Sequence, residues 1–168
     1  MSLGQELTVD HVQHVAEIAR FDRFIVRGPG ERDCWIWTGA IGDDGYGRFW
    51  VGRDGGPQVV RAARYALALD IGTVRSDVVA MHACDNPICV RCGRWHIRDG
   101  DQSQNLAEMS AKGRGGGRLL WPTGETRAER YARALRIREV VRVNGWDRPA
   151  VLAAIAGATP GLFDLTDL

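Results

Sequence analysis

The residue types that could do chemistry in this chain are concentrated in one stretch, residues 82–105. Three cysteines lie close together within it, separated by four and by two residues: Cys84, Cys89 and Cys92. His96 follows after three further residues. Thiolate and imidazole groups are preferred ligands of zinc, and a structural zinc site takes four ligands in a tetrahedron. Because the N-terminus shows no cleavable signal pattern, the clustered cysteines predict metal ligands rather than disulfides.

A zinc site in this stretch needs a fourth ligand besides Cys84, Cys89 and His96, and the sequence offers two candidates. Cys92 would complete a local knuckle within the same loop. Cys34, on a distant predicted strand, would instead staple the N-terminal half of the domain to the loop. Such a staple would add stability that a small hydrophobic core lacks.

His82 and Asn105 flank the cysteines and are not obvious zinc ligands. A histidine on a strand that faces an asparagine on a helix resembles a site for phosphodiester hydrolysis. A neutral His82 could take the proton of an attacking water. Asn105 could supply an oxygen ligand to Mg²⁺, an ion that keeps several waters beside substrate phosphate oxygens. The alternative is that His82 is a hydrogen-bonded core histidine and Asn105 a surface helix residue.

The whole block resembles the HNH endonucleases, also called ββα-metal or His-Me finger nucleases, in the zinc-bearing branch found in phage and intron-encoded enzymes. The matching residues follow in the order of that branch: His82, Cys84, Asp85, Asn86, Pro87, Cys89, Val90, His96, Gly100, Asn105, Met109, Lys112, Gly113 and Arg114. Upstream, residues 33–40 and 45–49 resemble the opening hairpin of the family, and residues 62–69 resemble its helix. The resemblance covers about residues 21–114 and implies the ββα-metal fold.

The resemblance also implies a role for each matching residue. His82 would be the general base, and Asn105 would bind the catalytic divalent metal, Mg²⁺, for which Mn²⁺ can substitute. Four residues would hold a structural zinc: Cys34, Cys84, Cys89 and His96. An arginine close to the scissile phosphate would assist catalysis. Arg64 is the first candidate for that arginine, with Arg48 and Arg61 as alternatives.

The chain departs from the family pattern between Cys89 and His96. Six residues separate them here, two more than in the family, and the usual Asn-Pro is replaced around Cys92. Cys92 is therefore an alternative zinc ligand that could displace Cys89 or Cys34.

Periodicity and turn signals predict the elements that must position these residues. In chain order they are a helix over 8–21, strands over 34–40 and 46–51 joined by a turn at 42–45, a second turn at 53–57, a helix over 60–69, strands over 78–82 and 95–98, a helix from Asp101 or Ser103 to about Lys112, and helices over 127–143 and 149–156. The fold class is α+β, with small antiparallel hairpins, a ββα-metal motif stapled by zinc and a C-terminal helical extension. The predicted domains are an N-terminal helical arm (1–31), a nuclease core (32–114) and the extension (119–168), with the glycine-rich residues 113–117 as linker.

Charge is spread unevenly along the chain. The net charge is only +1, yet 21 of the 22 basic residues are arginines, which suit bidentate phosphate and guanine contacts. A GC-rich genome would also enrich arginine. Residues 110–148 hold ten basic and four acidic residues. This local excess of positive charge indicates either a surface that binds a polyanion or a solvated helix face. The predicted DNA contacts are Arg48, Arg53, Arg61, Lys112, Arg114 and Arg118. The arginines over 127–142 either contact DNA or belong to a dimerisation helix.

The leading expectation is a Mg²⁺-dependent endonuclease that leaves 5′-phosphate and 3′-hydroxyl ends on double-stranded DNA, with a role in homing, restriction or phage packaging. A monomer would nick one strand only. Cleavage of both strands would be served by a symmetric homodimer. The alternative is a zinc-stabilised DNA-binding module without catalysis, which would need neither His82 nor Asn105. A thiol redox protein built on Cys89 and Cys92 is disfavoured because its βαβ context is absent. No apolar run reaches the about 18 residues needed to span a membrane, so we expect a soluble cytoplasmic protein.

Overall fold

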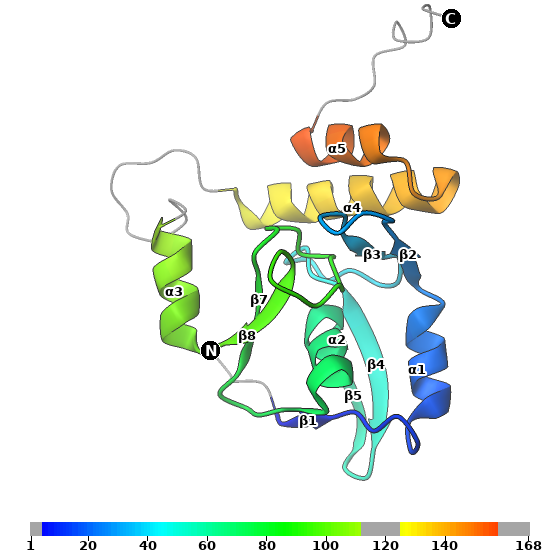
Figure 1. Cartoon of the computed structure of the whole chain (residues 1–168), viewed down its shortest axis with the longest axis vertical. Coiled ribbons are helices and arrows are strands. Elements are labelled where there is room, and N and C mark those ends of the chain that lie inside the picture. Colours follow the sequence, from blue (N-terminus) through cyan, green and yellow to red (C-terminus); the bar gives the residue numbers. More distant parts are fainter. Residues whose placement is uncertain (1–4, 112–124, 158–168) are drawn as a thin grey trace, which may run out of the picture.

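The computed structural model describes residues 5–111 and 125–157, which form short strands and helices arranged around the helix α2 (Figure 1). In chain order the elements are β1 (Leu7–Thr8), α1 (Val15–Asp22), β2 (Ile25–Arg27), β3 (Trp35–Trp37), β4 (Arg48–Arg53), β5 (Gly56–Arg61), α2 (Ala62–Ile71), β6 (Thr73–Val74), β7 (Val79–His82), β8 (Ile97–Gly100), α3 (Gln102–Ala111), α4 (Arg127–Asn144) and α5 (Arg148–Ala156). The predicted DNA contacts Lys112, Arg114 and Arg118, and the predicted linker 113–117, lie outside the described residues. Within the described ranges, no helix is long and apolar enough to cross a lipid bilayer.

The strands form small antiparallel pairs, as the sequence predicts. In the described part of the chain, β1 pairs with β6, β2 with β3, β4 with β5 and β7 with β8. Helices are interspersed with these pairs, and α4 and α5 follow at the C-terminal end. The mixed α+β class is therefore confirmed.

The predicted hairpin between residues 34–40 and 46–51 forms only next to its turn, where Ile41 bridges Gly47 and the Arg48 N–H donates to the Ala40 carbonyl at 2.8 Å. A turn does form at 42–45, where the Gly45 N–H donates to the Gly42 carbonyl at 2.8 Å. However, β3 pairs back with β2, and β4 pairs forward with β5. The reason lies at the Asp54-Gly55 turn, because an Asp-Gly pair between two strand-forming runs is a stronger hairpin signal than the longer loop. Residues 60 and 61 consequently end β5, and the following helix begins at Ala62 rather than at residue 60.

The core is centred on an aromatic cluster between α1, α2 and the strands. Phe21, Trp37, Phe49 and Tyr65 are each at most 4% exposed. Their rings pack in edge-on and stacked arrangements with centroids 4.5 to 5.6 Å apart. Such contacts add to the free energy gained by burying large apolar surfaces.

The N-terminal helix is shorter than predicted. Residues 7 and 8 pair with β6, and α1 starts only at Val15. Between them the Asp10 carboxylate accepts hydrogen bonds from the backbone N–H groups of Val12 and Gln13 at 2.8 and 2.7 Å. This local bonding satisfies the backbone in a turn and delays the helix.

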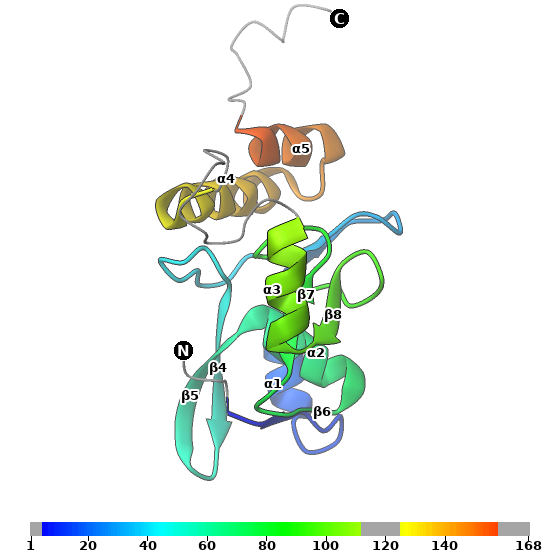
Figure 2. The ribbon, with the colours of Figure 1, turned by 90° about the vertical axis from the view of Figure 1, so that its left-hand side faces the viewer.

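The C-terminal helices lie where the sequence predicts them. Thr126 and Glu129 form a reciprocal capping box at the start of α4, and Gly145 follows its last residue. Ala134, Ile137 and Val141 of α4 are at most 1% exposed and belong to the same core as Phe21 and Trp37. Figure 2 shows α4 and α5 stacked at one end of the molecule, opposite the tip of the β4–β5 hairpin.

Candidate functional site

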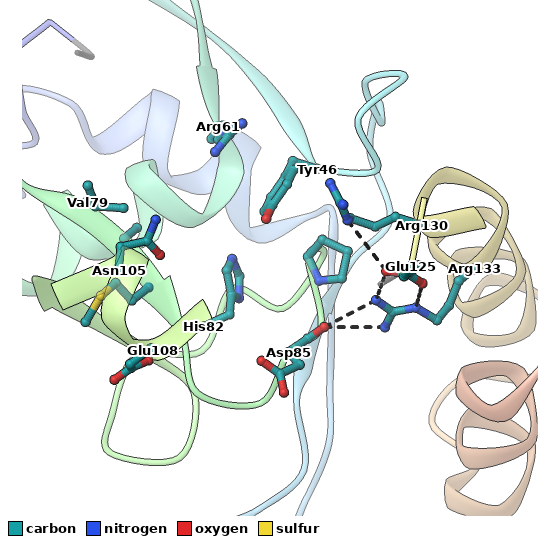
Figure 3. Close-up of a pocket in the computed structure, with 13 residues that line it drawn as sticks. Tyr46, Arg61, Val79, His82, Asp85, Asn105, Glu108, Glu125, Arg130 and Arg133 are labelled. Atoms are coloured by element: carbon teal, nitrogen blue, oxygen red, sulfur yellow. Dashed lines mark hydrogen bonds and ion pairs between the residues drawn. The ribbon is translucent and has the colours of Figure 1, made fainter. Parts of the chain in front are cut away.

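A hairpin and the helix that follows it carry the two residues predicted to do chemistry. His82 ends β7, where it pairs with Ile97 of β8. The Asp101 carboxylate accepts a hydrogen bond from the Gln104 backbone N–H at 2.8 Å and so starts α3. Asn105 lies in the first turn of that helix. His82 and Asn105 line one cavity of about 210 Å³ (Figure 3).

His82 is half-buried beside Cys84, a thiol whose pKa it helps to lower. Both ring nitrogens are shielded from solvent, and neither has a hydrogen-bond partner among the described residues. Figure 3 shows the ring between Asn105 and Tyr46, whose ring centroid lies 6.0 Å from that of His82. An unsatisfied buried polar group costs about 1–3 kcal/mol, and native structures contain few of them. The arrangement differs from that of a hydrogen-bonded core histidine.

Arg61 and Tyr46 cover a second side of this cavity. The Arg61 guanidinium lies 4.1 Å from the centre of the Tyr46 ring and donates to the Asp44 carboxylate at 3.1 Å. Arg48 donates to the same carboxylate at 2.8 Å. Burial alone would raise the pKa of Asp44, but the bonds from Arg48 and the Tyr46 N–H lower it. The Arg61 side chain is still 52% exposed, so it can reach a ligand.

The opposite wall of the cavity comes from α4 and from Glu125, two residues before the helix begins. Glu125, Arg130 and Arg133 line the cavity, and Figure 3 shows both guanidinium groups meeting the Glu125 carboxylate. A larger cavity of about 1010 Å³ adjoins it and shares His82, Asn105 and Arg130 with it. Arginines thus border both ends of a polar depression that contains the imidazole of His82.

A separate cluster of cysteines and one histidine lies beside this cavity. Its four ligand atoms all lie within 4.8 Å of one another: Cys34 Sγ, Cys84 Sγ, Cys89 Sγ and one ring nitrogen of His96. His96 Nδ1 is 3.8 Å from Cys34 Sγ and 3.7 Å from Cys89 Sγ. Ligands around a tetrahedral zinc are separated by roughly 3.5–3.8 Å. The cluster could therefore hold a zinc-like ion, with Cys34 as the stapling ligand.

The thiols of this cluster affect one another's ionisation. The adjacent Cys84 raises the pKa of Cys34 to about 12, with a smaller effect of burial in the same direction. Burial raises the pKa of the Cys89 thiol well above its ordinary value. Cys34 and Cys89 lower the pKa of Cys84, and His82 contributes to that lowering. A divalent metal bound at the cluster would stabilise the thiolate form of every cysteine ligand.

Cys92 lies outside the cluster, so the alternative in which it replaces Cys34 or Cys89 is not supported. Its backbone forms an isolated bridge with Ile97. Burial raises the pKa of its thiol to about 12, and the charge of Asp70 adds to the effect. A half-buried neutral thiol of this kind behaves as a small apolar residue.

The loop at residues 28–33 supports the cluster, a role that sequence reasoning missed. The carbonyl of Glu31 lies 2.9 Å from His96 Nε2, which fixes the ring with Nδ1 toward the sulfurs. Arg91 donates to the carbonyls of Gly30 and Asp33 and ties this loop to the cysteine-bearing one. Backbone carbonyls leave no residue-type signal, so the sequence could not identify Glu31.

Three of the arginines predicted at the site make contacts within the protein. Arg64 donates to four backbone carbonyls, at distances of 2.6 to 3.2 Å: those of Gln5, Val74, Arg75 and Val78. Arg53 forms a two-pronged ion pair with Glu17, and Arg48 pairs with Asp44. Of the predicted arginines, Arg61 lines both cavities.

Comparison with known proteins gives a partial similarity. No known protein family and no solved structure matches the chain. Protein 7.7 of Escherichia phage T7 is 37% identical over 82 residues, which are 49% of this chain and 58% of the phage protein. Protein 2.8 of the same phage is 35% identical over 81 residues, which are 48% of this chain and 52% of that protein. The chain thus spans about half the length of these relatives, and their names state no activity.

Proposed function

We propose that this protein is a metal-dependent DNA endonuclease of the HNH type, with His82 as general base. The observation that carries the proposal is the imidazole of His82, whose ring nitrogens are shielded from solvent and form no hydrogen bond, in an arginine-bordered cavity that it shares with Asn105. A histidine in that state is able to accept a proton from a water that enters the cavity. The substrate would be double-stranded DNA, and the products would carry 5′-phosphate and 3′-hydroxyl ends.

The residues of the cavity would divide the work of hydrolysis. His82 would remove a proton from the attacking water, and Asn105 would supply an oxygen ligand to the catalytic metal. Arg61, held against Tyr46 and still half exposed, would bind a phosphate oxygen. Arg64 takes no part in this proposal, because its donors are directed to backbone carbonyls.

Asn105 is the residue of the cavity that fits a catalytic Mg²⁺, for which Mn²⁺ can substitute. Among the described residues, the cysteine and histidine cluster is the sole convergence of three or more His, Cys, Asp or Glu ligand atoms. A metal beside Asn105 would therefore depend on water and substrate oxygens, as Mg²⁺ prefers. When bound, it would neutralise the charge that develops on the departing 3′ oxygen.

The cluster of Cys34, Cys84, Cys89 and His96 would hold a structural zinc. The types and spacing of its ligands suit zinc. Because the cluster lies next to His82, a metal there would also help to position that residue. The Ala83 N–H donates to the His96 carbonyl at 2.8 Å. A metal at the cluster would thereby fix the loop that leaves His82.

Cleavage of both strands as a homodimer stays a prediction.

The test is plasmid nicking with Mg²⁺ by the wild-type chain, His82→Ala and a matched control, His11→Ala. His11 is exposed and lies outside both cavities. Loss of a general base lowers rates by about 10²–10⁴-fold, so His82→Ala should be nearly inactive and His11→Ala unchanged. Zinc content and duplex binding should be equal in all three proteins.

Two results would contradict the proposal. One is nicking by His82→Ala at the wild-type rate. The other is a wild-type chain that binds zinc and DNA but nicks no DNA, including phage and host DNA, with Mg²⁺ or Mn²⁺. The second result would favour the non-catalytic DNA-binding module.

A further inference from the structure

Two arginines of α4 form an oxyanion-binding arrangement at the edge of the cavity that holds His82. Arg133 grips the Glu125 carboxylate with two prongs, through Nε to Oε1 at 2.6 Å and Nη2 to Oε2 at 2.9 Å. Arg130 Nε approaches the same carboxylate at 3.5 Å. The side chains of Arg133 and Arg130 are 15% and 29% exposed, so both are partly desolvated. Charge-assisted pairs gain strength in such surroundings.

The Glu125 carboxylate meets guanidinium donors of a kind that also suits a phosphate. Carboxylates and phosphates present oxygen pairs of similar geometry to the planar guanidinium group. Glu125 is also dispensable for starting α4, because Thr126 and Glu129 supply the capping box. Its contact with the two arginines therefore has no evident role in helix formation.

The guanidinium groups are held in a fixed position relative to His82. Ala134 and Ile137 anchor α4 in the core. Arg138 donates to the Gly39 carbonyl at 3.3 Å, and Arg133 lies 3.4 Å from the Asp85 carbonyl. Asp85 follows His82 by three residues, so α4 contacts the same loop that carries the imidazole.

We propose that Arg130 and Arg133 bind a backbone phosphate of the DNA that enters the His82 cavity, and that Glu125 occupies their donors until DNA displaces it. The inference rests on the proposed function for its ligand, a nucleic-acid phosphate. It assigns α4 a wall of the substrate site, beyond a general role in DNA contact or dimerisation. Arg61 would then bind DNA from one side of His82 and the α4 pair from the other.

The experiment measures duplex DNA binding by fluorescence anisotropy over a salt series, with all variants built on His82→Ala to prevent cleavage. Arg133→Gln and Arg130→Gln should each weaken binding by about tenfold and reduce the salt slope by about one. Arg23→Gln is the control, because Arg23 is exposed at the end of α1 and lines neither cavity. It should bind within about twofold of its parent.

Glu125→Gln should change the affinity for duplex DNA in the opposite direction to the arginine variants. Without the competing carboxylate, binding should tighten by about threefold or more at low salt, where electrostatic attraction is strongest. Arg133→Lys keeps the positive charge but cannot form the two-pronged contact of the guanidinium group. It serves as a second test of the same position in case Arg133→Gln fails to fold. It should recover part of the affinity.

The outcomes separate this inference from the nuclease proposal. Binding by Arg133→Gln and Arg130→Gln equal to that of the parent overturns the inference, even if the wild-type chain cuts DNA. Tighter binding by Glu125→Gln together with weaker binding by Arg133→Gln supports it, even if the wild-type chain never cuts. A chain that does not bind duplex DNA at all overturns it as well.

Discussion

At the scale of single residues, Cys34 and Cys92 have the same chemistry but different surroundings. Cys34 Sγ lies with two other thiols and His96, whereas Cys92 lies apart from them as a half-buried thiol whose pKa is raised. Under the proposed zinc site, Cys34→Ser should remove a ligand and lower bound zinc from one ion per chain to well below one. Cys92→Ser should keep a full ion, since it alters no ligand. Zinc released on denaturation, measured with a colorimetric chelator, would distinguish the two.

The same pair of variants should differ in stability. Loss of a structural zinc removes binding free energy that is also folding free energy, so Cys34→Ser should unfold at a clearly lower temperature. The wild-type chain treated with a strong chelator should approach the Cys34→Ser value. Equal zinc content in both variants, or one zinc per chain lost from Cys92→Ser, would show that the ligand set is wrong.

At the scale of elements, Gly45 lets α4 approach the turn at residues 42–45. Its φ is +83°, and a Cβ added there would lie 2.9–3.0 Å from the Cγ and backbone of Arg130. Gly45→Ala should therefore cost about 1–3 kcal/mol through strain and displacement. If α4 forms a wall of the DNA site, DNA affinity should fall as well. Thermal unfolding and duplex binding measure the two effects.

Gly55→Ala is the control for this effect. Gly55 lies in a turn of similar composition, but a Cβ there would meet nothing within 4 Å, and its φ is not in the left-handed region. It should change both quantities little. Should Gly45→Ala match Gly55→Ala, the contact between Gly45 and α4 would have no energetic weight.

The elements also show why part of the site could be predicted from sequence and part could not. His82, Asn105 and most of the cysteine cluster lie on contiguous elements, so spacing alone indicates that they meet. The arginines do not follow from spacing. Arg61 ends a strand and Arg64 lies one turn into the following helix, so the two point to different surroundings. A predicted helix start one residue earlier than Arg61 hides that difference.

Contacts between distant elements explain why the remaining features of the fold and the site could not be predicted from the sequence. β2 pairs with β3 through two three-residue strands, which are too short to give a clear alternating pattern. Glu125 meets the His82 cavity only because α4 folds back onto the core through Ile137 and Val141. Neither fact is encoded in local periodicity, since both depend on which surfaces are buried together.

At the scale of the whole molecule, one ion pair ties the N-terminal helix to the β4–β5 hairpin. Arg53 contacts Glu17 through two prongs, at 2.8 and 3.0 Å, and the two side chains are 19% and 12% exposed. Burial alone would raise the pKa of Glu17, but the hydrogen bonds and charge of Arg53 lower it below its usual value. Arg53, predicted as a DNA contact, thus joins two parts of the fold.

The lowered pKa of Glu17 sets the pH at which this pair stabilises the protein. A carboxyl group whose pKa is lower in the folded state contributes stability above its unfolded pKa, about 4.3, and loses it as the pH falls through the folded pKa. Glu17→Gln should therefore lower stability by about 1–2 kcal/mol at pH 7, and the deficit should shrink to nearly zero toward pH 3. The stability of the wild-type chain, Glu17→Gln and the exposed control Glu139→Gln should be measured by thermal unfolding at each pH. All three proteins share the effect of acid on the proposed zinc site, so this effect cancels when their stabilities are compared. A deficit that stays constant from pH 7 to pH 3 would mean that Glu17 acts through packing, and that its charge does not hold α1 to the hairpin.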